Sequence, residues 1–428
     1  MAAPLGETPA AVVLAEDRSA AVAAPVAVPA AVPRWPAIAA LPYSLYWAHV
    51  VALFGLAASN VLLGLAVLTA PLSGGWRGLG RRACRPLLLV VALYVALHAL
   101  SVVTSFDPPR SARSLSELFA LCTLLAGLAL VRDERAVRGM VDAVVLLATG
   151  EAVFGLVQLV AAGGPDLAHR IQGTFSHYMT FSGILMIADL VLLARLVARG
   201  RDSGWRAWAL VPINAALVAT LTRSAWVGLA VGLAVLLLLG RRRLLLWWVP
   251  AALLLLLLLP PAVLDRAASI VDPGDPTNSD RLCMARAGAA MIRERPLVGQ
   301  GPDMVEVRYP LYRIPEATRK WVPHLHDAFL EVAAERGLPA LVALLLLLGV
   351  PAGRALVDYR REGGRSGPRA DLWLAVLGGL VGFAVAGLFE DNWGDVEVQR
   401  LVLVLLAVPY GLARQDEPAS WPTRLPSP

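Results

Sequence analysis

The sequence predicts an all-α, polytopic membrane protein of about twelve transmembrane helices. Of the 428 residues, 57% are apolar and 16% are charged, whereas soluble domains average about 45–50% apolar and about 25% charged residues. The apolar residues stand in unbroken blocks such as 244–259, which is typical of spanning helices and not of the alternating strands of an outer-membrane barrel. This composition excludes a soluble globular enzyme, a disordered protein and a collagen-like protein.

A membrane-spanning helix needs about 20 predominantly apolar residues. Residues 41–72 are too long for one span and are interrupted by Ser59, Asn60 and Gly64, so two short spans are expected there. The other ten spans are predicted at 86–105, 115–131, 140–162, 175–198, 205–221, 224–240, 244–262, 338–357, 371–389 and 396–413. The Ala-, Pro- and Val-rich residues 1–40 are predicted to be a disordered cytoplasmic tail, not a signal peptide, and 414–428 a second tail.

The arginines of the short loops predict the orientation. Eighteen fall in one set of loops, and four fall in the alternate set, namely Arg110, Arg113, Arg170 and Arg223. Because cytoplasmic loops carry the excess of basic residues, the richer set and both termini are expected in the cytoplasm. Nine spans are then expected over 41–262 and three over 338–413, with a long outer loop at 263–337.

The outer loop carries nine basic residues between Arg266 and Lys320. Long loops do not follow the positive-inside rule, so this charge needs another explanation, and an anionic ligand is expected. A helix is predicted at 280–295, capped by Ser279 or Asn278, with Arg281 in its first turn. A helix N-terminus beside an arginine suits a phosphate; the alternative is a surface helix whose arginines meet water or lipid headgroups.

The run from His324 to Asp327 opens a helix that is expected to enter the membrane near Leu338. Two histidines with a carboxylate can bind zinc, a histidine can act as a general base, and the segment can also be a polar helix start. Asp327 is followed at i+4 spacing by Glu331 and Glu335, so the three are expected to share one face. His324 is expected to point away from His326.

Arg223 stands at a tight turn between two apolar spans. It either snorkels to the interface or contacts a ligand in a wet cavity. In the predicted topology six chemically capable residues fall on the outer side, namely His177, Arg223, Arg281, Arg286, His326 and Asp391. An outer cavity lined by arginines with a histidine at its edge suits a lipid-linked phosphate donor and a hydroxyl acceptor.

Four stretches, in this order, resemble the O-antigen ligase and polymerase superfamily of bacterial inner-membrane glycosyltransferases, over roughly residues 170–400. They are Gly173-Thr174-Phe175-Ser176-His177, Thr222-Arg223-Ser224-Ala225-Trp226, Ser279-Asp280-Arg281 running to Arg295-Pro296-Leu297-Val298-Gly299-Gln300-Gly301, and His324-Leu325-His326-Asp327-Ala328-Phe329-Leu330-Glu331 followed by Glu335-Arg336-Gly337-Leu338. Asp327 stands where the family usually has asparagine, and His177 replaces the family's Asn-rich form of the first stretch.

The resemblance implies a GT-C-like helical fold and an O-antigen ligase activity. Such enzymes transfer a glycan from undecaprenyl diphosphate to a hydroxyl of lipid A–core on the periplasmic face of the inner membrane, without a metal, another cofactor or nucleic acid. His326 is then the catalytic base. Arg223, Arg281 and Arg286 hold the diphosphate, and His324, His177 and Asp391 are further substrate-binding residues.

Three alternatives stay open. An O-antigen or exopolysaccharide polymerase of the same superfamily would use a second lipid-linked chain as acceptor, and a protein O-glycosylating enzyme would use a protein hydroxyl. A membrane transporter is the alternative from a different class. Charges at the membrane midplane would favour a transporter, and Glu151 and Asp189 are the main candidates for such charges.

Overall fold

The structure is a computed structural model that describes residues 36–80, 82–131, 133–165, 167, 169–247, 250, 260–272 and 274–413. The chain divides into two units, Met1–Pro36 and Ala37–Pro428, and the architecture below is that of the second. All secondary structure in the described ranges is helical. Eight of the described helices are long and apolar enough to cross a membrane. The chain is therefore an all-α protein with the helices of a polytopic membrane protein, as predicted.

The α-helices that the structure describes are, in chain order, α1 (Pro36–Val51), α2 (Leu56–Thr69), α3 (Arg85–Val103), α4 (Pro108–Ser111), α5 (Leu121–Leu130), α6 (Glu134–Ala161), α7 (Tyr178–Arg199), α8 (Leu210–Ala219), α9 (Arg223–Gly240), α11 (Pro261–Ala268), α12 (Pro276–Glu294), α13 (Val305–Tyr312), α14 (Ala328–Arg361), α15 (Ala370–Gly387) and α16 (Val396–Leu412). Short 3₁₀ helices connect several of them, including Ala112–Ala120 before α5 and Gly200–Ala209 before α8.

The number of spans stays a prediction. Most of the predicted span at 244–262 and the tails at 1–35 and 414–428 lie outside the described residues. Residues 36–40, which the sequence assigned to the first tail, are the first residues of α1. The segment predicted as two short spans forms two helices, α1 and α2, with Gly55 between them in an extended conformation.

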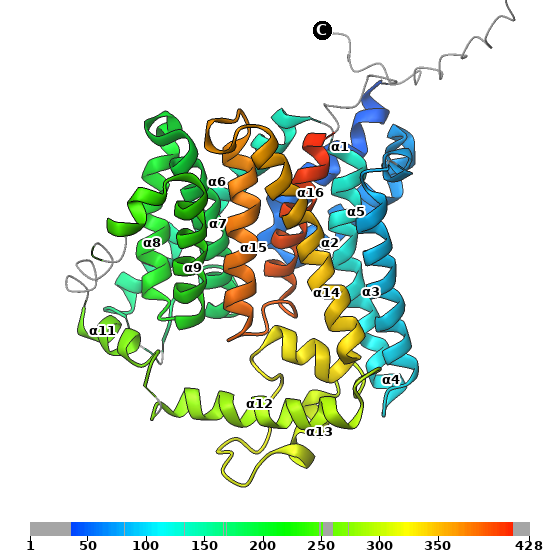
Figure 1. Ribbon diagram of the computed structural model, residues 1–428, viewed down its shortest axis with the longest axis vertical. Helices are drawn as coiled ribbons and strands as arrows, with labels where there is room; N and C mark the ends of the chain where they lie inside the picture. The colour runs from blue at the N-terminus through cyan, green and yellow to red at the C-terminus, as the bar shows by residue number, and fades with distance from the viewer. Residues whose placement is uncertain are drawn as a thin grey trace, which may run out of the picture. The chain divides into compact units, whose positions relative to one another are not determined.

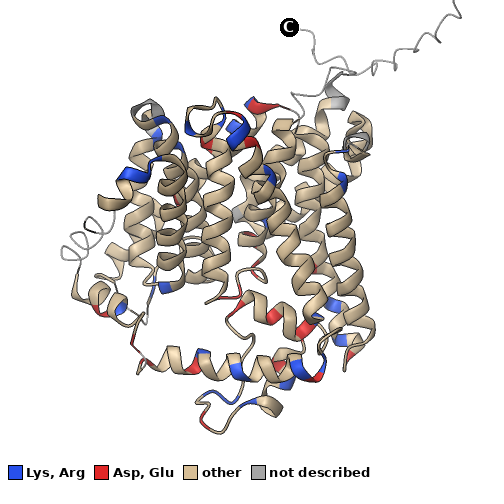
Figure 2. Ribbon diagram, in the orientation of Figure 1, with Lys and Arg blue, Asp and Glu red and all other residues tan. Residues whose placement is uncertain are grey.

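The helices form a bundle in which α15 packs between α7 and α9, while α14 packs against α3 (Figure 1). The central helices are almost entirely buried; Trp373 and Phe383 of α15 are each only 1% exposed. Most charged residues lie toward the two ends of the bundle and few lie along its middle (Figure 2). A hydrocarbon layer requires this distribution, because a charged side chain at the bilayer centre is costly.

Arginines from several of the predicted cytoplasmic loops meet at one end of the bundle. Arg138 contacts Asp371 at 2.7 Å, Arg199 contacts the same carboxylate at 3.3 Å, and Arg206 pairs with Asp142. The start of α1 and the end of α16 lie at this end, and α12 and α13 lie at the other (Figure 1). The sequence therefore grouped these loops correctly. We call the second end the α12 end.

The helix that the sequence predicted at 280–295 begins earlier, at Pro276. Asp275 is its N-cap, and the Asp275 carboxylate accepts a hydrogen bond from the backbone N–H of Asn278 at 3.1 Å. The predicted cap at Ser279 or Asn278 is therefore wrong. Proline at the first helical position after a capping aspartate is a favourable helix start. Arg281 consequently lies beyond the first turn of α12 and not within it, as the sequence had predicted.

A second, smaller core fixes the segment around α12 and α13. Its buried members come from α12, α13, the loop before α14 and the start of α14, and are Met284, Ala287, Met291, Val305, Tyr309, Val322, Leu325 and Ala334. Gly288 lets α12 approach this loop closely, because a Cβ there would come within 2.7 Å of Leu325. The packing therefore holds α12 against the loop that carries the paired histidines.

The long helix α14 is broken at Gly337, where φ is 85°. The stretch after α12 packs its backbone against this break: Leu338 N–H donates to the Pro296 carbonyl at 2.8 Å, and Gln300 N–H donates to the Ala334 carbonyl at 2.9 Å. A Cβ on Gly337 would lie 2.5 Å from the Leu297 carbonyl carbon, so only glycine fits. The break separates residues 328–336 from the apolar remainder of α14, as the expected membrane entry near Leu338 requires.

Candidate functional site

The loop that carries the two histidines is shaped by the start of α14. Asp327 is the N-cap of α14, and its Oδ1 accepts the backbone N–H groups of Phe329 and Leu330 at 3.0 and 2.9 Å. One turn further along, the buried Glu331 turns back and accepts the backbone N–H of Leu325 at 2.7 Å. Two of the three acidic residues that the sequence placed on one helix face, Asp327 and Glu331, therefore hold the loop in place, whereas Glu335 accepts the Val305 N–H and pairs with Arg336.

The loop brings both histidine rings to the same side. His326 has φ +52°, a left-handed conformation that is uncommon for a residue with a side chain. The centroids of the His324 and His326 rings are 4.2 Å apart, and the His326 backbone N–H donates to His324 Nδ1 at 3.4 Å. The expectation that His324 points away is therefore wrong, because it assumed regular backbone between the two residues.

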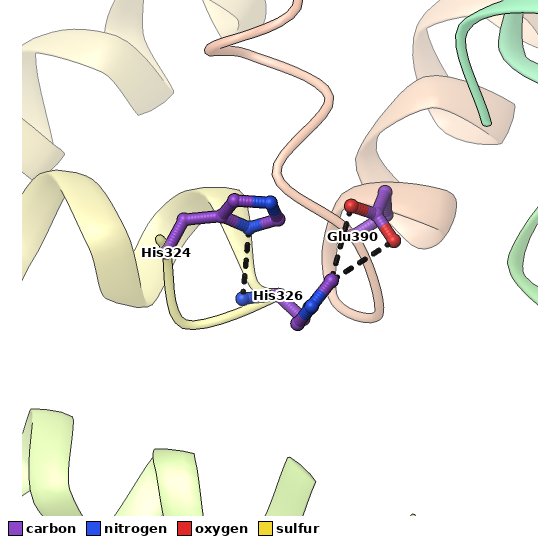
Figure 3. Close-up of side chains that lie close together, drawn as sticks. All are labelled: His324, His326 and Glu390. Carbon is purple, nitrogen blue, oxygen red and sulfur yellow. Dashed lines mark hydrogen bonds and ion pairs between the residues drawn. The ribbon is translucent and has the colours of Figure 1, made fainter. Parts of the chain in front are cut away.

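Glu390, in the loop that follows α15, faces His326. The His326 Nδ1 atom lies 3.2 and 3.3 Å from the two carboxylate oxygens (Figure 3). Burial acts to raise the pKa of Glu390, but its hydrogen bond with His326, with smaller contributions from His324 and Arg281, lowers it on balance. An ionised carboxylate only accepts hydrogen bonds, so Nδ1 carries the proton and the lone pair of His326 is at Nε2.

Glu390 was not among the site residues predicted from the sequence. The pairing with His326 joins positions 64 residues apart, and no local spacing reveals it. The only available signal was topological, because both residues fall in outer loops of the predicted topology.

Arg281 reaches the same carboxylate from α12. Its Nη2 atom lies 4.0 Å from Glu390 Oε2, and its Nε is buried without a hydrogen-bond partner among the described residues. Burial lowers the pKa of Arg281, and the charge of Arg223 lowers it further, against the opposing effect of Glu390. Arg281 is thus a buried cation with unused hydrogen-bonding capacity beside the His326–Glu390 pair.

Arg281 belongs to an arginine cluster that we define as Arg170, Arg223, Arg266 and Arg281. Burial, the charges of Arg223 and Arg170 and, more weakly, that of Arg281 lower the pKa of Arg266 to about 10. Arg170 lies over the Tyr178 ring at 4.4 Å, and its Nε is buried without a hydrogen-bond partner in the described part of the chain. Mutual repulsion of this kind favours an anion among the guanidinium groups.

Arg170 and Arg266 were not among the predicted site residues. Arg170 was counted only for topology, and Arg266 only as one of the basic residues of the outer loop. Their charges interact between the loop before α7 and helix α11, and the sequence pattern contains no signal for this.

Arg223 has a different environment from Arg281. It is 4% exposed, and its Nη1 donates to the Ser269 carbonyl at 2.6 Å and to Ser269 Oγ at 2.9 Å. Its Nη2 donates to the Asp275 carboxylate at 3.2 Å. These bonds join the start of α9 to the N-cap of α12, so Arg223 contributes charge to the cluster while several of its donors hold the fold together.

The remaining predicted site residues are dispersed around this centre. Arg286 is exposed on α12. His177 is the N-cap of α7, where its Nδ1 accepts the Met179 N–H at 3.2 Å; burial lowers the pKa of His177, and the charges of Glu390 and Asp395 oppose this effect. The structure thus places His177 within electrostatic reach of Glu390, and its imidazole is used in capping.

Asp391 follows Glu390 and faces the other histidine. Burial raises the pKa of Asp391, and the positive charge of His324 opposes this shift. Burial also lowers the pKa of His324, and the neighbouring His326 lowers it further. The Gly394 N–H donates to Asp391 Oδ1 at 3.2 Å. The two consecutive acidic residues after α15 therefore interact with different histidines. Glu390 contacts His326, and Asp391 interacts electrostatically with His324.

The two histidines of this loop and Glu390 form the only group of three potential metal ligands found among the described residues. One ligand atom each from His324, His326 and Glu390 lies within 4.8 Å of the others. The metal alternative derived from the sequence paired the two histidines with an unspecified carboxylate, for which Asp327 is the nearest in sequence. The structure replaces it with Glu390, because the Asp327 oxygen is occupied by the N–H groups of α14.

A bundle of apolar helices with a partly exposed histidine–carboxylate pair beside an arginine cluster defines a membrane protein with a polar site at one end of its helices. Residues 207–345 match the family model described as O-antigen ligase. Over these residues the chain is similar to the O-antigen ligase family. The matched region includes Arg223, Arg281, His324 and His326, whereas Glu390 lies outside it. No curated protein matches the chain.

Proposed function

We propose that the protein is an O-antigen ligase-type glycosyltransferase of a bacterial inner membrane, with its α12 end in the periplasm. It would transfer a glycan from undecaprenyl diphosphate to a hydroxyl of lipid A–core. The observation that carries this proposal is the contact between His326 and Glu390. It lies beside Arg281, whose Nε has no partner among the described residues, and residues 207–345 match the O-antigen ligase family model. A base, a group that orients it and a cation for the leaving group then occupy one site.

His326 is the general base in this proposal. Glu390 holds Nδ1–H and directs the free Nε2 toward the acceptor hydroxyl, as a carboxylate does for the histidine of a catalytic triad. The carboxylate also stabilises the imidazolium that forms when Nε2 takes the proton. A positioned base of this kind contributes about 10²–10⁴-fold to the rate.

The arginine cluster holds the diphosphate of the donor. As the bond between the anomeric carbon and the diphosphate breaks, negative charge develops on the leaving oxygen, and fixed guanidinium groups stabilise it. Arginine suits this task because it stays charged when buried and binds phosphate oxygens in a bidentate manner. Arg281 and Arg170 have buried Nε atoms without partners in the described ranges, so we assign the direct diphosphate contacts to them.

The reaction is a single displacement. The acceptor oxygen, deprotonated by His326, attacks the anomeric carbon as the diphosphate leaves, and the new glycosidic bond has inverted configuration. The acceptor proton passes to His326 Nε2. Because the leaving group is already good and cations stabilise it, we expect the transfer to proceed in the presence of a chelator.

The transporter alternative is weakened at Glu151, whereas Asp189 keeps one buried carboxylate oxygen, Oδ2, without a hydrogen-bond partner among the described residues. The Glu151 carboxylate accepts the Thr174 backbone N–H at 2.9 Å and the Thr174 hydroxyl at 2.8 Å, so it stabilises the loop before α7. The buried Asp189 accepts a hydrogen bond from Asn214 at 3.0 Å. Both acidic residues therefore have partners within the fold.

The test uses the purified protein in nanodiscs with a lipid-diphosphate-linked glycan, a chelator and two alternative acceptors. Glycan attached to lipid A–core supports the ligase assignment. Elongation of the lipid-linked glycan alone would identify a polymerase instead. Failure to transfer glycan to either acceptor, with the same protein moving the donor across a sealed bilayer, would identify a transporter and overturn the proposal.

A further inference from the structure

We propose that His324, His326 and Glu390 form a binding site for a divalent transition-metal ion, represented by Zn²⁺, and that this ion inhibits the enzyme by occupying the base. The inhibitory role rests on the proposed function, because it requires His326 to act as the base. The metal site itself rests only on the geometry of three side chains.

The three ligands come from two segments that the fold brings together. His324 and His326 lie in the loop before α14, and Glu390 lies in the loop after α15 (Figure 3). One ligand atom from each residue lies within 4.8 Å of the other two. In tetrahedral zinc sites with metal–ligand bonds of about 2.0–2.2 Å, neighbouring ligand atoms are about 3.3–3.5 Å apart. Side-chain movements of about one ångström would therefore close the site around an ion.

The backbone at His326 supports a functional use of this arrangement. Residues two apart in a regular strand or helix do not direct both side chains to one point. Here the left-handed φ of +52° at His326 turns the loop so that the imidazoles lie 4.2 Å apart between their centroids. Such backbone strain clusters at active sites and ligand clamps. The Glu331–Leu325 hydrogen bond and the Asp327 cap maintain the turn.

The donor set selects the class of metal. Two imidazole nitrogens with one carboxylate suit Zn²⁺, Co²⁺, Ni²⁺ or Cu²⁺, whereas Mg²⁺ and Ca²⁺ prefer oxygen ligands. All three residues are partly exposed, so the site can admit an ion and leaves a coordination position for water. Arg281, 4.0 Å from Glu390, opposes a cation electrostatically. We therefore expect a reversible, inhibitory ion and not a permanently bound structural one.

Inhibition follows from the chemistry of His326. When an imidazole nitrogen donates its lone pair to a metal, that lone pair cannot accept a proton from the acceptor hydroxyl. Coordination by Glu390 also removes the carboxylate that orients the ring. The ion would thus block proton transfer without touching the arginine cluster, and donor binding should persist in its presence.

The direct test titrates Co²⁺ into the protein in detergent, purified without a polyhistidine tag, and follows the visible d–d absorption. We expect one Co²⁺ per chain, displaced by Zn²⁺ and unaffected by Mg²⁺. His324→Ala, His326→Ala and Glu390→Gln should each weaken Co²⁺ binding at least about tenfold, the scale for removing one metal-site residue. His177→Ala is the matched control, because it removes a nearby histidine that is not a ligand, and it should bind Co²⁺ as wild type does.

Thermal unfolding of each variant shows whether it is folded. The proposal is overturned if wild type gives no Co²⁺ spectrum, or if folded His324→Ala and Glu390→Gln bind Co²⁺ as tightly as wild type. Loss of binding in His177→Ala equal to that in His324→Ala would also overturn the assigned ligand set.

The inhibition test measures glycan transfer against Zn²⁺ concentration, with each variant scaled to its own rate without zinc. Zinc should inhibit wild type, and the inhibitory concentration should rise at least tenfold in His324→Ala. If transfer depends on His326 but zinc does not inhibit, the inference fails and the proposed function stands. If Co²⁺ binds as expected but His326→Ala retains full transfer, the proposed function fails and the metal site stands.

Discussion

The Nδ1 atom of His326 lies 3.2 Å from Oε1 of Glu390, which joins the loop before α14 to the loop after α15. The contact fixes the ring tautomer and leaves Nε2 free. It also brings Arg281 of α12 within 4.0 Å of the same carboxylate. Three helices are thereby connected at one partly exposed acidic group, and each partner of that group has a separable effect on the proposed reaction.

Replacing His326 by alanine should lower glycan transfer by about 10²–10⁴-fold, the usual contribution of a positioned base. Binding of the lipid-diphosphate donor should persist, because the arginine cluster is unchanged. Single-turnover transfer and donor binding, measured on the same nanodisc sample, separate the two effects. Full transfer activity in this variant would show that the base lies elsewhere.

Glu390→Gln should reduce transfer by about 10- to 100-fold, the usual effect of a residue that positions a functional group. The amide keeps the shape of the side chain but loses the charge that stabilises an imidazolium. The loss should therefore appear in kcat more than in KM. Glu316→Gln, the same change at an exposed position of the outer segment, is the control. Equal activity of the two variants would contradict the positioning role.

Arg281→Ala should weaken transition-state stabilisation by about 2–4 kcal/mol, the range for removing an electrostatic stabiliser, which is a rate loss of about 30- to 1000-fold. Arg281→Lys should recover only part, since lysine lacks the planar fork. Arg293→Ala removes the same charge from an exposed position of α12 and should retain its transfer rate. Steady-state glycan transfer compares the three, and equal rates in Arg281→Ala and Arg293→Ala would remove Arg281 from the diphosphate site.

Labelling of single cysteines tests the proposed orientation. The three native cysteines, of which Cys84 and Cys283 are buried, are first replaced by serine or alanine. A membrane-impermeant maleimide applied from the periplasm should react with a cysteine placed at 310 and not with one placed at 365. Both positions are exposed, so accessibility within the fold does not bias the comparison. The reverse pattern would place the candidate site on the cytoplasmic side.

Much of the fold could be predicted because its signals are local or additive. Hydropathy over about 20 residues defines a span, and the arginine distribution grouped loops that the structure joins through Arg138, Arg199 and Asp371. The cap of α12 was missed although its signal was present: Asp275 followed by Pro276 is a favourable helix start. The run Asn278-Ser279-Asp280 offered equally good caps, and propensity alone did not separate the two choices.

The composition of the site was harder to predict because it depends on long-range contacts. His326 was identified from its own loop, but its partner Glu390 is 64 positions away. The convergence of His324 on His326 requires a left-handed backbone at a residue other than glycine, and the sequence gives no sign of it. Arg170 and Arg266 likewise interact only because the fold brings the charges of the loop before α7 and of α11 together.

The ion pair between Arg223 and Asp275 should make the N-terminus of α12 sensitive to acid. Burial acts to raise the pKa of Asp275, but the Asn278 N–H and Arg223 lower it on balance. A folded-state pKa below the ordinary value of about 3.9 means that this stabilisation is present above pH ~4 and is lost as the pH falls through the folded value.

Asp275→Asn keeps a good capping side chain and removes only the charge. Hydrogen exchange at amides 277–280, corrected for intrinsic rates, should speed up in wild type upon acidification, be fast at every pH in Asp275→Asn, and match wild type in the exposed control Asp272→Asn. Wild-type protection of the Asp275→Asn variant across the whole pH range would show that the pair with Arg223 does not hold α12 in place.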